Sequence, residues 1–459
     1  MSGFPTLRLM LAAALFAAQL VFAPGASAQV AGRARPNLVI ILADDLGYGD
    51  LSAFGAKDIK TPNIDALAAA GLRFDNFYAN SPVCSPSRAA LLTGRYPDMV
   101  GVPGVIREDA RDSWGYLAPG ARLLPELLKG AGYDTALVGK WHLGVESPNL
   151  PNERGFRLFR GFLGDMMDDY VTHLRGGVNF MRENRRTVSP RGHATDVFTR
   201  WAVEYLDERA HSRRPFFLYL AYNAPHVPVQ PPADFVERVR RREPGLGEQR
   251  LKLAALVEHL DEGVGRVVAA LKRNGQWENT LVVFASDNGG QLNVGASNAP
   301  LRGGKEEMYE GGIRVPACAA WPGRVERGSR TARAAMLMDL WPTFLEAAGV
   351  RARPKVDGVS LMPLLLGGEE GGAVRTLFWV RREGGDFYFG QDYYAVRRGP
   401  WKLLQNHPYM PFRLYNLDAD PREQRDVAAD NRAVVEGLAR ELREHIRLAG
   451  AVPWRDGRR

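Results

Sequence analysis

Short, continuous apolar runs recur along the first two thirds of the chain and alternate with amphipathic segments. Such runs are typical of strands that a sheet buries on both faces. The amphipathic segments have apolar residues three and four positions apart, as in a helix with one buried face, and the longest covers residues 249–273. Strands that alternate with helices predict an α/β fold with a mostly parallel central sheet between helices. The clearest strands are predicted at residues 36–43, 216–221 and 280–285.

Shorter segments add further elements to this part of the chain. Thr61, Pro62 and Asn63 precede an Ala-rich periodic stretch that stops at Gly71, which predicts a capped helix. The other predicted elements are a helix that begins just after Cys84 and includes residues 88–93, a helix over 123–129 and a strand over 135–138.

The pattern changes after about Val350. Short strands separated by Gly-Pro turns are predicted there and resemble an antiparallel meander, and a terminal helix follows at residues 429–448. We therefore predict a large domain over residues 29–349 and a smaller C-terminal α+β unit with a short antiparallel sheet over residues 350–459. The strands of this unit are predicted at 377–380, 394–397 and 401–404.

The N-terminus has the pattern of a secretory signal peptide. Arg8 is followed by an apolar run, Leu9 to Phe22, and by the small residues Ala26-Ser27-Ala28 at the expected cleavage site. Residues 1–28 are predicted to be a cleavable signal, and an uncleaved anchor is the alternative. The protein is therefore expected in the periplasm or outside the cell. That compartment permits disulfides, so a bridge between the two cysteines, Cys84 and Cys318, stays open.

The composition is that of a globular protein. Of 459 residues, 45% are hydrophobic and 24% are charged, which excludes a disordered, collagen-like or polytopic membrane protein. The net charge is +8, largely from arginine, but no dense Lys/Arg run occurs in the body of the chain. We therefore expect no nucleic-acid partner and no stable membrane association.

Acidic side chains follow two of the predicted strands. Asp44 and Asp45 come directly after the first strand, and Asp287 and Asn288 follow the strand at 280–285. In an open α/β sheet, ligands bind outside the carboxyl ends of the strands. An all-oxygen set there favours Ca²⁺, with Mg²⁺ as a second choice, over zinc. Helix N-capping is the alternative use of these residues.

Basic side chains stand at comparable places. Lys140 and His142 follow the strand at 135–138, and His226 follows the strand at 216–221. Lys305 lies in a Gly-rich loop. For each of them taken alone, a surface or structural role is the alternative. His259 falls within the long predicted helix, and we interpret it as structural.

One segment points to a family. Residues 84–95, CSPSRAALLTGR, resemble the signature of the type I, formylglycine-dependent sulfatases, C-x-P-S-R-x-x-x-L-T-G-R, and fill every fixed position. The similarity continues through PNLVIILADDLGYGD, GKWHLG, SDNGG and EGGIRVP, from Pro36 to the terminal helix. The chain resembles arylsulfatase A and N-acetylgalactosamine-6-sulfatase, of the alkaline phosphatase superfamily. The resemblance implies an alkaline-phosphatase-like sandwich.

The resemblance also implies a modified nucleophile and a metal site. Cys84 would be oxidised to Cα-formylglycine by a maturation enzyme. One hydroxyl of the hydrated aldehyde would attack the sulfur of a sulfate ester, and the second would allow sulfate to leave. Calcium would be held by an oxygen of modified residue 84 and by the side chains of Asp44, Asp45, Asp287 and Asn288.

The remaining roles follow from the same resemblance. Arg88 would offset negative charge beside residue 84, and Lys140 and Lys305 would hold sulfate oxygens. His142 would accept the proton of the second hydroxyl, and His226 would protonate the leaving group. Asp168 is the nearest match to a position that contacts sulfate in many relatives, and we leave its contact open.

The implied activity is hydrolysis of sulfate monoesters, of either an aryl alcohol or a saccharide. The alternatives are a phosphate or phosphonate monoester hydrolase of the same superfamily and a protein that binds sulfated glycans without turnover. Substrate choice would depend on the rim of the site. Candidate rim residues are Trp114, Tyr170, His173, Arg175, Trp379, Arg381, Arg382 and Tyr393.

Overall fold

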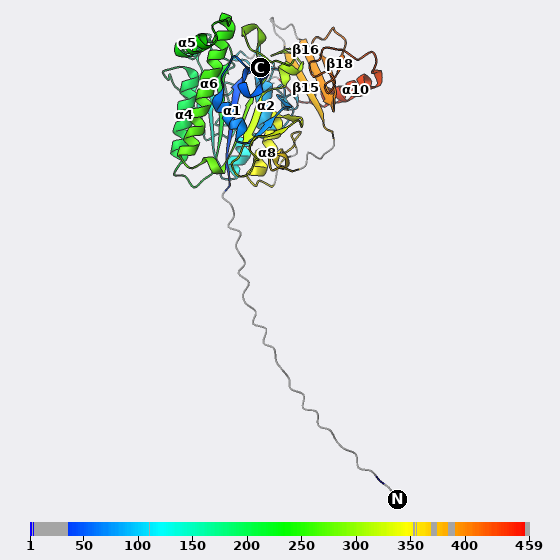
Figure 1. Cartoon of the computed structure of the whole chain (residues 1–459), viewed down its shortest axis with the longest axis horizontal. Helices are drawn as coiled ribbons and strands as arrows, with labels where there is room; N and C mark the ends of the chain where they lie inside the picture. Colours follow the sequence, from blue (N-terminus) through cyan, green and yellow to red (C-terminus); the bar gives the residue numbers. More distant parts are fainter. Residues whose placement is uncertain are drawn as a thin grey trace. The chain divides into compact units, whose positions relative to one another are not determined.

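A ten-stranded, mostly parallel sheet runs through the larger part of the protein (Figure 1). Its five central strands, in the order β11-β1-β10-β4-β5, are all parallel. The added strands β12 and β8, one on each side, pair antiparallel with this core. The strands, in sheet order, are β13 (Ser329–Thr331), β2 (Leu72–Phe74), β12 (Ala317–Ala320), β11 (Thr280–Ser286), β1 (Asn37–Asp44), β10 (Phe216–Pro225), β4 (Asp134–Lys140), β5 (Leu158–Phe162), β8 (Met181–Glu183) and β9 (Arg186–Thr187).

This computed structural model describes residues 1, 3, 35–109, 111–351, 354, 356–368, 374–383 and 391–454. Arg35–Arg459 form one compact unit, distinct from Met1–Ala34. The predicted signal peptide lies outside the described residues, so it stays a prediction. In the part of the chain that the structure describes, every helix is too short or too polar to cross a membrane.

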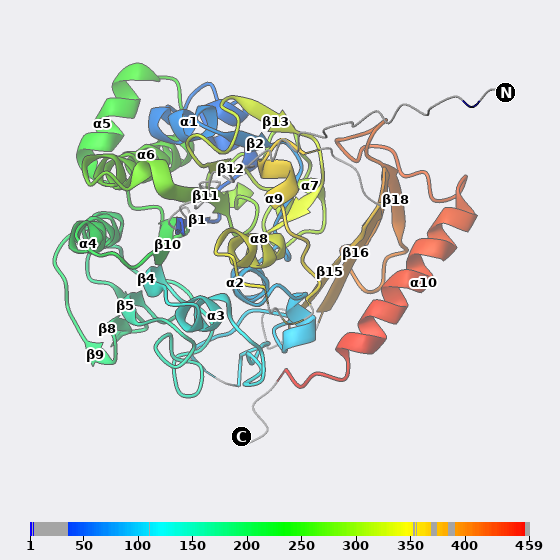
Figure 2. The same ribbon diagram turned by 90° about the horizontal axis from the view of Figure 1, so that it is seen from below.

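Helices cover both faces of the sheet, which explains the continuous apolar runs. In β1, Leu38 and Ile40 pack into one hydrophobic cluster, and their neighbours Val39 and Ile41 pack into another on the opposite face. Figure 2 shows one group of helices on each side of the sheet. One group contains α1 (Pro62–Ala69), α4 (Ala194–Arg209) and α6 (Glu248–Arg273), and the other contains α2 (Cys84–Thr93), α3 (Leu124–Gly130) and α8 (Leu340–Ala347).

The C-terminal part contains a separate antiparallel sheet of four strands, in the order β15-β16-β17-β18. The long helix α10 (Arg432–Ala449) packs on one face through Leu438 and Leu442. The other face, with Trp379, packs in a hydrophobic cluster that also contains Tyr78 and Ala90. The predicted α/β class with an antiparallel C-terminal sheet is therefore confirmed, and the boundary at residue 350 stays a prediction. The strands are β15 (Thr376–Glu383), β16 (Gln391–Arg398), β17 (Trp401–Gln405) and β18 (Arg413–Asn416).

Two element boundaries differ from the sequence prediction in ways that matter for the site. The helix predicted to begin just after Cys84 begins at Cys84 itself. Strand β10 extends to Pro225, so His226 directly follows its end.

Both cysteines, Cys84 and Cys318, are buried and free, so the disulfide left open is not formed. The remaining elements are β3 (Phe77–Tyr78), β6 (Leu174–Arg175), β7 (Val178–Asn179), β14 (Ala335–Met336), α5 (Ala233–Arg242), α7 (Glu310–Ile313) and α9 (Met362–Leu365).

Candidate active site

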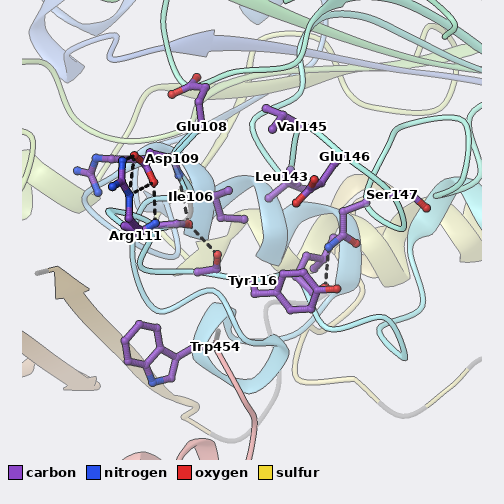
Figure 3. Close-up of a pocket in the computed structure, with 16 residues that line it drawn as sticks. Ile106, Glu108, Asp109, Arg111, Tyr116, Leu143, Val145, Glu146, Ser147 and Trp454 are labelled. Carbon is purple, nitrogen blue, oxygen red and sulfur yellow. Dashed lines mark hydrogen bonds and ion pairs between the residues drawn. The ribbon is translucent and has the colours of Figure 1, made fainter. Parts of the chain in front are cut away.

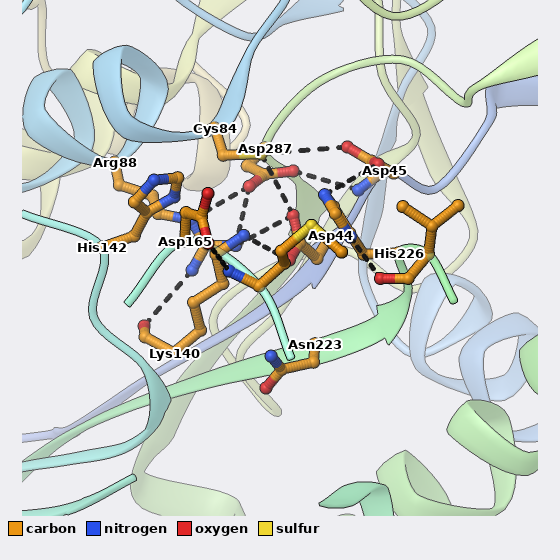
Figure 4. Close-up of polar contacts among 12 residues, drawn as sticks. Asp44, Asp45, Cys84, Arg88, Lys140, His142, Asp165, Asn223, His226 and Asp287 are labelled. Carbon is orange, nitrogen blue, oxygen red and sulfur yellow. Dashed lines mark hydrogen bonds and ion pairs between the residues drawn. The ribbon is translucent and has the colours of Figure 1, made fainter. Parts of the chain in front are cut away.

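The carboxyl ends of β1 and β11 bring the predicted acidic residues together (Figure 4). The backbone N–H of Asp45 donates to Asp287 Oδ1 at 3.2 Å, and the Asn288 amide donates to Asp45 Oδ1 at 2.7 Å. Asp44 and Asp287 are fully buried. Asp45 has φ 63°, a left-handed conformation that Asp tolerates better than most residues. Strand ends that are far apart in the sequence thus form one acidic cluster.

Cys84 lies over this cluster as the first residue of α2. Its Sγ is 3.4 Å from Asp44 Oδ1 and 3.9 Å from Asp45 Oδ1. The N-cap residue, Val83, makes no side-chain hydrogen bond, so α2 has no side-chain cap at the end that carries Cys84, where Pro86 in the first turn has no N–H. Burial raises the pKa of the Cys84 thiol well above its usual value. The thiol is therefore neutral at physiological pH.

Three cations, of which Lys140 and Arg88 are fully buried and Lys305 is partly buried, neutralise the carboxylates. Lys140 Nζ lies 2.7 Å from Asp44 Oδ2, and Arg88 Nη2 lies 2.7 Å from Asp287 Oδ2 and 3.4 Å from Asp44 Oδ1. Lys305 Nζ lies 2.7 Å from an oxygen of the remaining carboxylate, Asp45 Oδ2. Burial alone would raise the pKa of Asp44, but Lys140 and the other cations outweigh it and hold that pKa well below its usual value.

His142 has a defined tautomer. Its Nε2 lies 2.8 Å from the carbonyl oxygen of Ile106, which can only accept, so Nε2 carries the proton. Nδ1 is then an acceptor, and it is buried with no hydrogen-bond partner among the described groups. Burial, helped by Lys140 and Arg88, lowers the pKa of His142 well below its usual value. His142 is therefore a neutral base with a free lone pair.

Both ring nitrogens of His226 have a hydrogen-bond partner. Its Nδ1 donates to the carbonyl oxygen of Val227 at 2.7 Å, and its Nε2 lies 3.0 Å from Lys305 Nζ. The lysine ammonium is the donor in that contact, because burial and Lys305 lower the pKa of His226. The two residues therefore form one hydrogen-bonded pair beside Asp45.

These groups lie at the base of a cavity of about 580 Å³. Cys84, His142, His226 and Lys305 line it, as do two of the predicted rim residues, Arg175 and Arg381. Sequence reasoning missed other charged lining residues, which come from loops without a recognisable motif. These are Arg107, Asp112, Asp165 and Glu306.

Asp165, rather than Asp168, lines the cavity in the loop after β5. Asp168 binds Arg175 Nη1 at 2.8 Å and accepts from the Gly176 N–H at 2.6 Å. Asp165 Oδ1 lies 3.0 Å from Arg175 Nε, so both carboxylates orient the same arginine.

The other predicted rim residues do not line this cavity. Trp379 is buried, and its indole N–H donates to the Ala79 carbonyl. Tyr170 and His173 are also buried, and the Tyr170 hydroxyl lies 2.8 Å from the His226 carbonyl oxygen. Trp114 stacks on Trp454 beside a different cavity. Arg382 and Tyr393 lie on β15 and β16. His259 is buried on α6 with Nε2 3.1 Å from Asp196, in keeping with a structural role.

The acidic cluster fits a hard cation. Asn288 Oδ1 is buried and has no hydrogen-bond partner among the described groups, although its amide N–H binds Asp45. A buried acceptor without a partner is costly, and a cation at this point would satisfy it. Asp44, Asp45, Cys84 and His226 also offer ligand atoms within 4.8 Å of one another. The carboxylate and amide oxygens are the donor set that calcium or magnesium prefers.

Comparisons with known proteins agree with this geometry. The family model described as Sulfatase matches residues 36–350, and the one described as N-sulphoglucosamine sulphohydrolase, C-terminal, matches residues 304–448. N-acetylgalactosamine-6-sulfatase of Canis lupus familiaris is 34% identical over 439 residues, covering 85% of this chain and 81% of the relative. Arylsulfatase A of Homo sapiens is 39% identical over 360 residues, covering 72% of this chain and 68% of the relative.

A solved structure extends the likeness to three dimensions. The crystal structure described as Ps i-CgsB in complex with k-i-k-neocarrahexaose has a TM-score of 0.82 and 36% identity, covering 89% of this chain and 92% of that one. The fold thus places the chain in the alkaline phosphatase superfamily of hydrolases. Within that superfamily the chain belongs to the sulfatase family, and it is a sulfuric ester hydrolase.

Proposed function

We propose that this enzyme hydrolyses sulfate monoesters with a formylglycine made from Cys84 and a calcium ion held by Asp44, Asp45, Asp287 and Asn288. The observation that carries the proposal is the position of Cys84. It begins α2, 3.4 Å from Asp44, in a cluster that contains three further carboxylate and amide side chains and the cations Lys140, Arg88 and Lys305.

The state of Cys84 supports modification. A cysteine nucleophile needs a thiolate, but this thiol is buried against Asp44 and its pKa is raised well above the usual value. An unmodified Cys84 is therefore a poor nucleophile. Formylglycine would supply a hydroxyl nucleophile through its hydrate. Its formation requires a maturation enzyme as a partner, as the signature around residues 84–95 implies.

The metal site has the residues that a divalent cation needs, and the bound ion would supply Lewis-acid stabilisation of the sulfate group. The chain itself contributes positive charge around the same point. Lys140 and Arg88 are fixed by Asp44 and Asp287, so their charges are held in place before substrate binds. The uncapped N-terminus of α2 adds its N–H groups towards an anion.

Two proton positions follow from the histidines. His142 Nδ1 holds a free lone pair and can accept the proton of a hydroxyl on residue 84. The Lys305–His226 pair carries a proton at the cavity side of the cluster, where we place the leaving oxygen. We assign His226 and Lys305 jointly to protonation of the departing alcohol.

The ester alcohol is most simply a saccharide. A related structure, 36% identical, contains the oligosaccharide named k-i-k-neocarrahexaose, and the cavity walls carry charged groups that bind hydroxyls. The relatives do not favour the phosphate or phosphonate alternative or binding without turnover. We propose that the protein acts in the periplasm or outside the cell, in keeping with its N-terminal pattern.

A mixed panel tests this function. Matured protein is assayed for release of inorganic anion from 4-nitrophenyl sulfate, sulfated amino-sugar and uronate oligosaccharides, and 4-nitrophenyl phosphate. We expect sulfate release that a calcium chelator removes and added Ca²⁺ or Mg²⁺ restores. Faster cleavage of the phosphate than of every sulfate ester would favour the superfamily alternative. Full activity in chelator would refute the metal assignment.

A further inference from the structure

A second cavity, of about 460 Å³, opens next to the catalytic one (Figure 3). Its walls come from two loops, residues 106–117 and 143–149, and from Trp454 near the end of the chain. The volume is within the range of about 300–1,000 Å³ that is usual for small-ligand sites. None of the roles assigned above uses this cavity.

The two cavities are neighbours that share one wall. Arg107 lines both of them. On either side of it, the Ile106 carbonyl receives the hydrogen bond of His142, and Glu108 Oε1 accepts from the backbone N–H of Asp165 at 2.7 Å. His142 and Asp165 line the catalytic cavity. The second cavity is therefore the immediate neighbour of the cavity that contains Cys84, on the other side of Arg107.

The walls of the second cavity suit a sugar ring. Val145 provides apolar surface over the fully buried Leu117 and Leu143, and Tyr116 and Trp454 provide flat aromatic faces. Trp454 is fixed because it stacks on Trp114, with ring centroids 4.7 Å apart and planes 17° apart. The C–H face of a pyranose packs against such surfaces, and a few polar groups then orient its hydroxyls.

The charges of this cavity do not suit an anion. Among its described lining residues, Asp109 is paired with Arg111, Arg107 is paired with Glu383 from outside the cavity, and Glu108 and Glu146 are two further carboxyl groups. Arg107 Nη2 lies 3.1 Å from Glu383, and Arg111 Nη2 lies 2.6 Å from Asp109. A second sulfate or a uronate carboxylate would meet this acidic set, whereas carboxylates accept readily from neutral hydroxyls.

We propose that this cavity is a subsite for an uncharged sugar ring adjacent to the sulfated ring of an oligosaccharide. The inference rests on the proposed sulfatase function and narrows its substrate class. The preferred ester would be a saccharide in which a sulfated ring is linked to a neutral one, rather than a free monosaccharide sulfate or a sugar whose neighbour is a uronate.

The test compares four sulfate esters: a monosulfated monosaccharide, the two disaccharides in which that ring is linked to a neutral sugar on one side or on the other, and the disaccharide in which it is linked to a uronic acid. For matured protein we expect kcat/KM about tenfold higher for one neutral disaccharide than for the monosaccharide, equivalent to about 1.4 kcal/mol. The uronate disaccharide should gain nothing. Equal values for the neutral disaccharides and the monosaccharide, or a preference for the uronate, would overturn the subsite.

Two variants test whether the second cavity causes the preference for a neutral disaccharide. Trp454→Ala removes an aromatic wall, and Val145→Trp fills the cavity from a loop. Each should bring the disaccharide-to-monosaccharide ratio close to one. Tyr409→Ala is the matched control, because Tyr409 is 89% exposed and lies outside both cavities. An unchanged ratio in both cavity variants would contradict the proposal.

A binding measurement separates this inference from the proposed function. Calcium-loaded Cys84→Ala protein is titrated with the monosaccharide, both neutral disaccharides and the uronate disaccharide. Calorimetry measures their binding and needs no turnover. Tighter binding of a neutral disaccharide, lost in the Cys84→Ala/Trp454→Ala double variant, supports the subsite even if the matured enzyme releases no sulfate. Equal affinities for the disaccharides and the monosaccharide would refute it even if the enzyme is an active sulfatase.

Discussion

Among single residues, His142 shows how local geometry prepares a catalytic group. Its backbone has φ 58°, the left-handed region that few non-glycine residues adopt. That conformation turns the ring so that Nε2 binds the Ile106 carbonyl and Nδ1 is left without a partner among the described groups. Strained backbone of this kind is kept where the surrounding structure enforces it, often at functional sites.

His142→Asn tests the role of the ring. Asn tolerates the left-handed conformation, so the fold should persist, but it offers no base. We expect kcat for sulfate release to fall by about 10²–10⁴ with an unchanged melting temperature. His211→Asn, at an exposed histidine, is the control and should match the parent enzyme. A loss of less than about threefold in His142→Asn would remove this residue from the mechanism.

The same residue sets an acid limit on activity. Because the pKa of His142 is lowered, its neutral form persists below the ordinary histidine range and is lost only as pH falls through that lowered pKa. The kcat of the parent enzyme should therefore stay level as the pH falls to 6.5, which is the unperturbed pKa of a histidine. A pH profile of kcat that falls below half its maximum already at that pH would contradict the assigned base.

The sequence predicts those site residues that directly follow buried strands. Asp44, Asp287 and His226 stand at strand ends, and the carboxyl ends of parallel strands must meet at one edge of the sheet. Arg107 and Asp165 could not be found this way, because their loops reach the cavity only through tertiary packing. The sequence pattern pointed to Asp168, three residues after Asp165, which is the residue that lines the cavity.

At the scale of elements, the C-terminal sheet holds the loop that carries Lys305. From β17, Lys402 Nζ lies 2.9 Å from both Glu310 Oε1 and Glu423 Oε1, and all three side chains are buried. From β15, Arg381 Nη1 donates to the Glu306 carbonyl at 2.8 Å. The segment over residues 305–310 is thus fixed at two points by the C-terminal sheet.

Lys402→Met should therefore destabilise the protein strongly. It leaves Glu310 and Glu423 buried without their shared cation, at a cost of about 3–5 kcal/mol in the free energy of unfolding measured with urea. Lys252→Met, at a half-exposed lysine of α6, should change it by no more than about 0.5 kcal/mol. A similarly small change in Lys402→Met would show that the cation is dispensable.

The pH dependence of this loss has a defined sign. Burial would raise the pKa of Glu310, but Lys402, with Arg397 and Arg314, lowers it to about 2. A carboxyl with a depressed pKa in the folded state adds stability above its unfolded pKa, and this stability is lost as pH falls through the folded value. The destabilisation by Lys402→Met should therefore be largest near neutral pH and shrink in acid, as paired unfolding curves would show.

The sequence predicted those strands whose burial on both faces produces a continuous run of apolar residues. Strands β1, β10 and β11 are apolar throughout because helices cover both of their faces. The short strands β2 and β12 have too few residues to form such a run. Helix α4 begins at an unusual N-cap, His193, whose ring accepts from the Thr195 N–H, so the usual Ser, Thr or Asp start signal is missing.

For the whole molecule, the two sheets contribute to one catalytic cavity. The larger sheet supplies the acidic cluster, and β15 of the C-terminal sheet supplies Arg381 to the cavity wall. The two matching family models overlap over residues 304–350, the stretch that begins with the Lys305 loop. The sequence predicted both sheets, but it could not show that the C-terminal sheet fixes the Lys305 loop, because those contacts join residues 75 and 92 positions apart.

The most direct test is the rate of sulfate release by Cys84→Ala protein made together with the maturation enzyme, with Cys318→Ala, made in the same way, as the matched control. Both cysteines are buried and free, but only Cys84 lies over the acidic cluster. We predict that Cys84→Ala loses at least about a thousandfold in kcat and that Cys318→Ala stays within about threefold of the parent. Mass analysis of the parent should show residue 84 as the aldehyde. Full activity in Cys84→Ala, or in parent protein whose residue 84 is an unmodified thiol, would contradict the account.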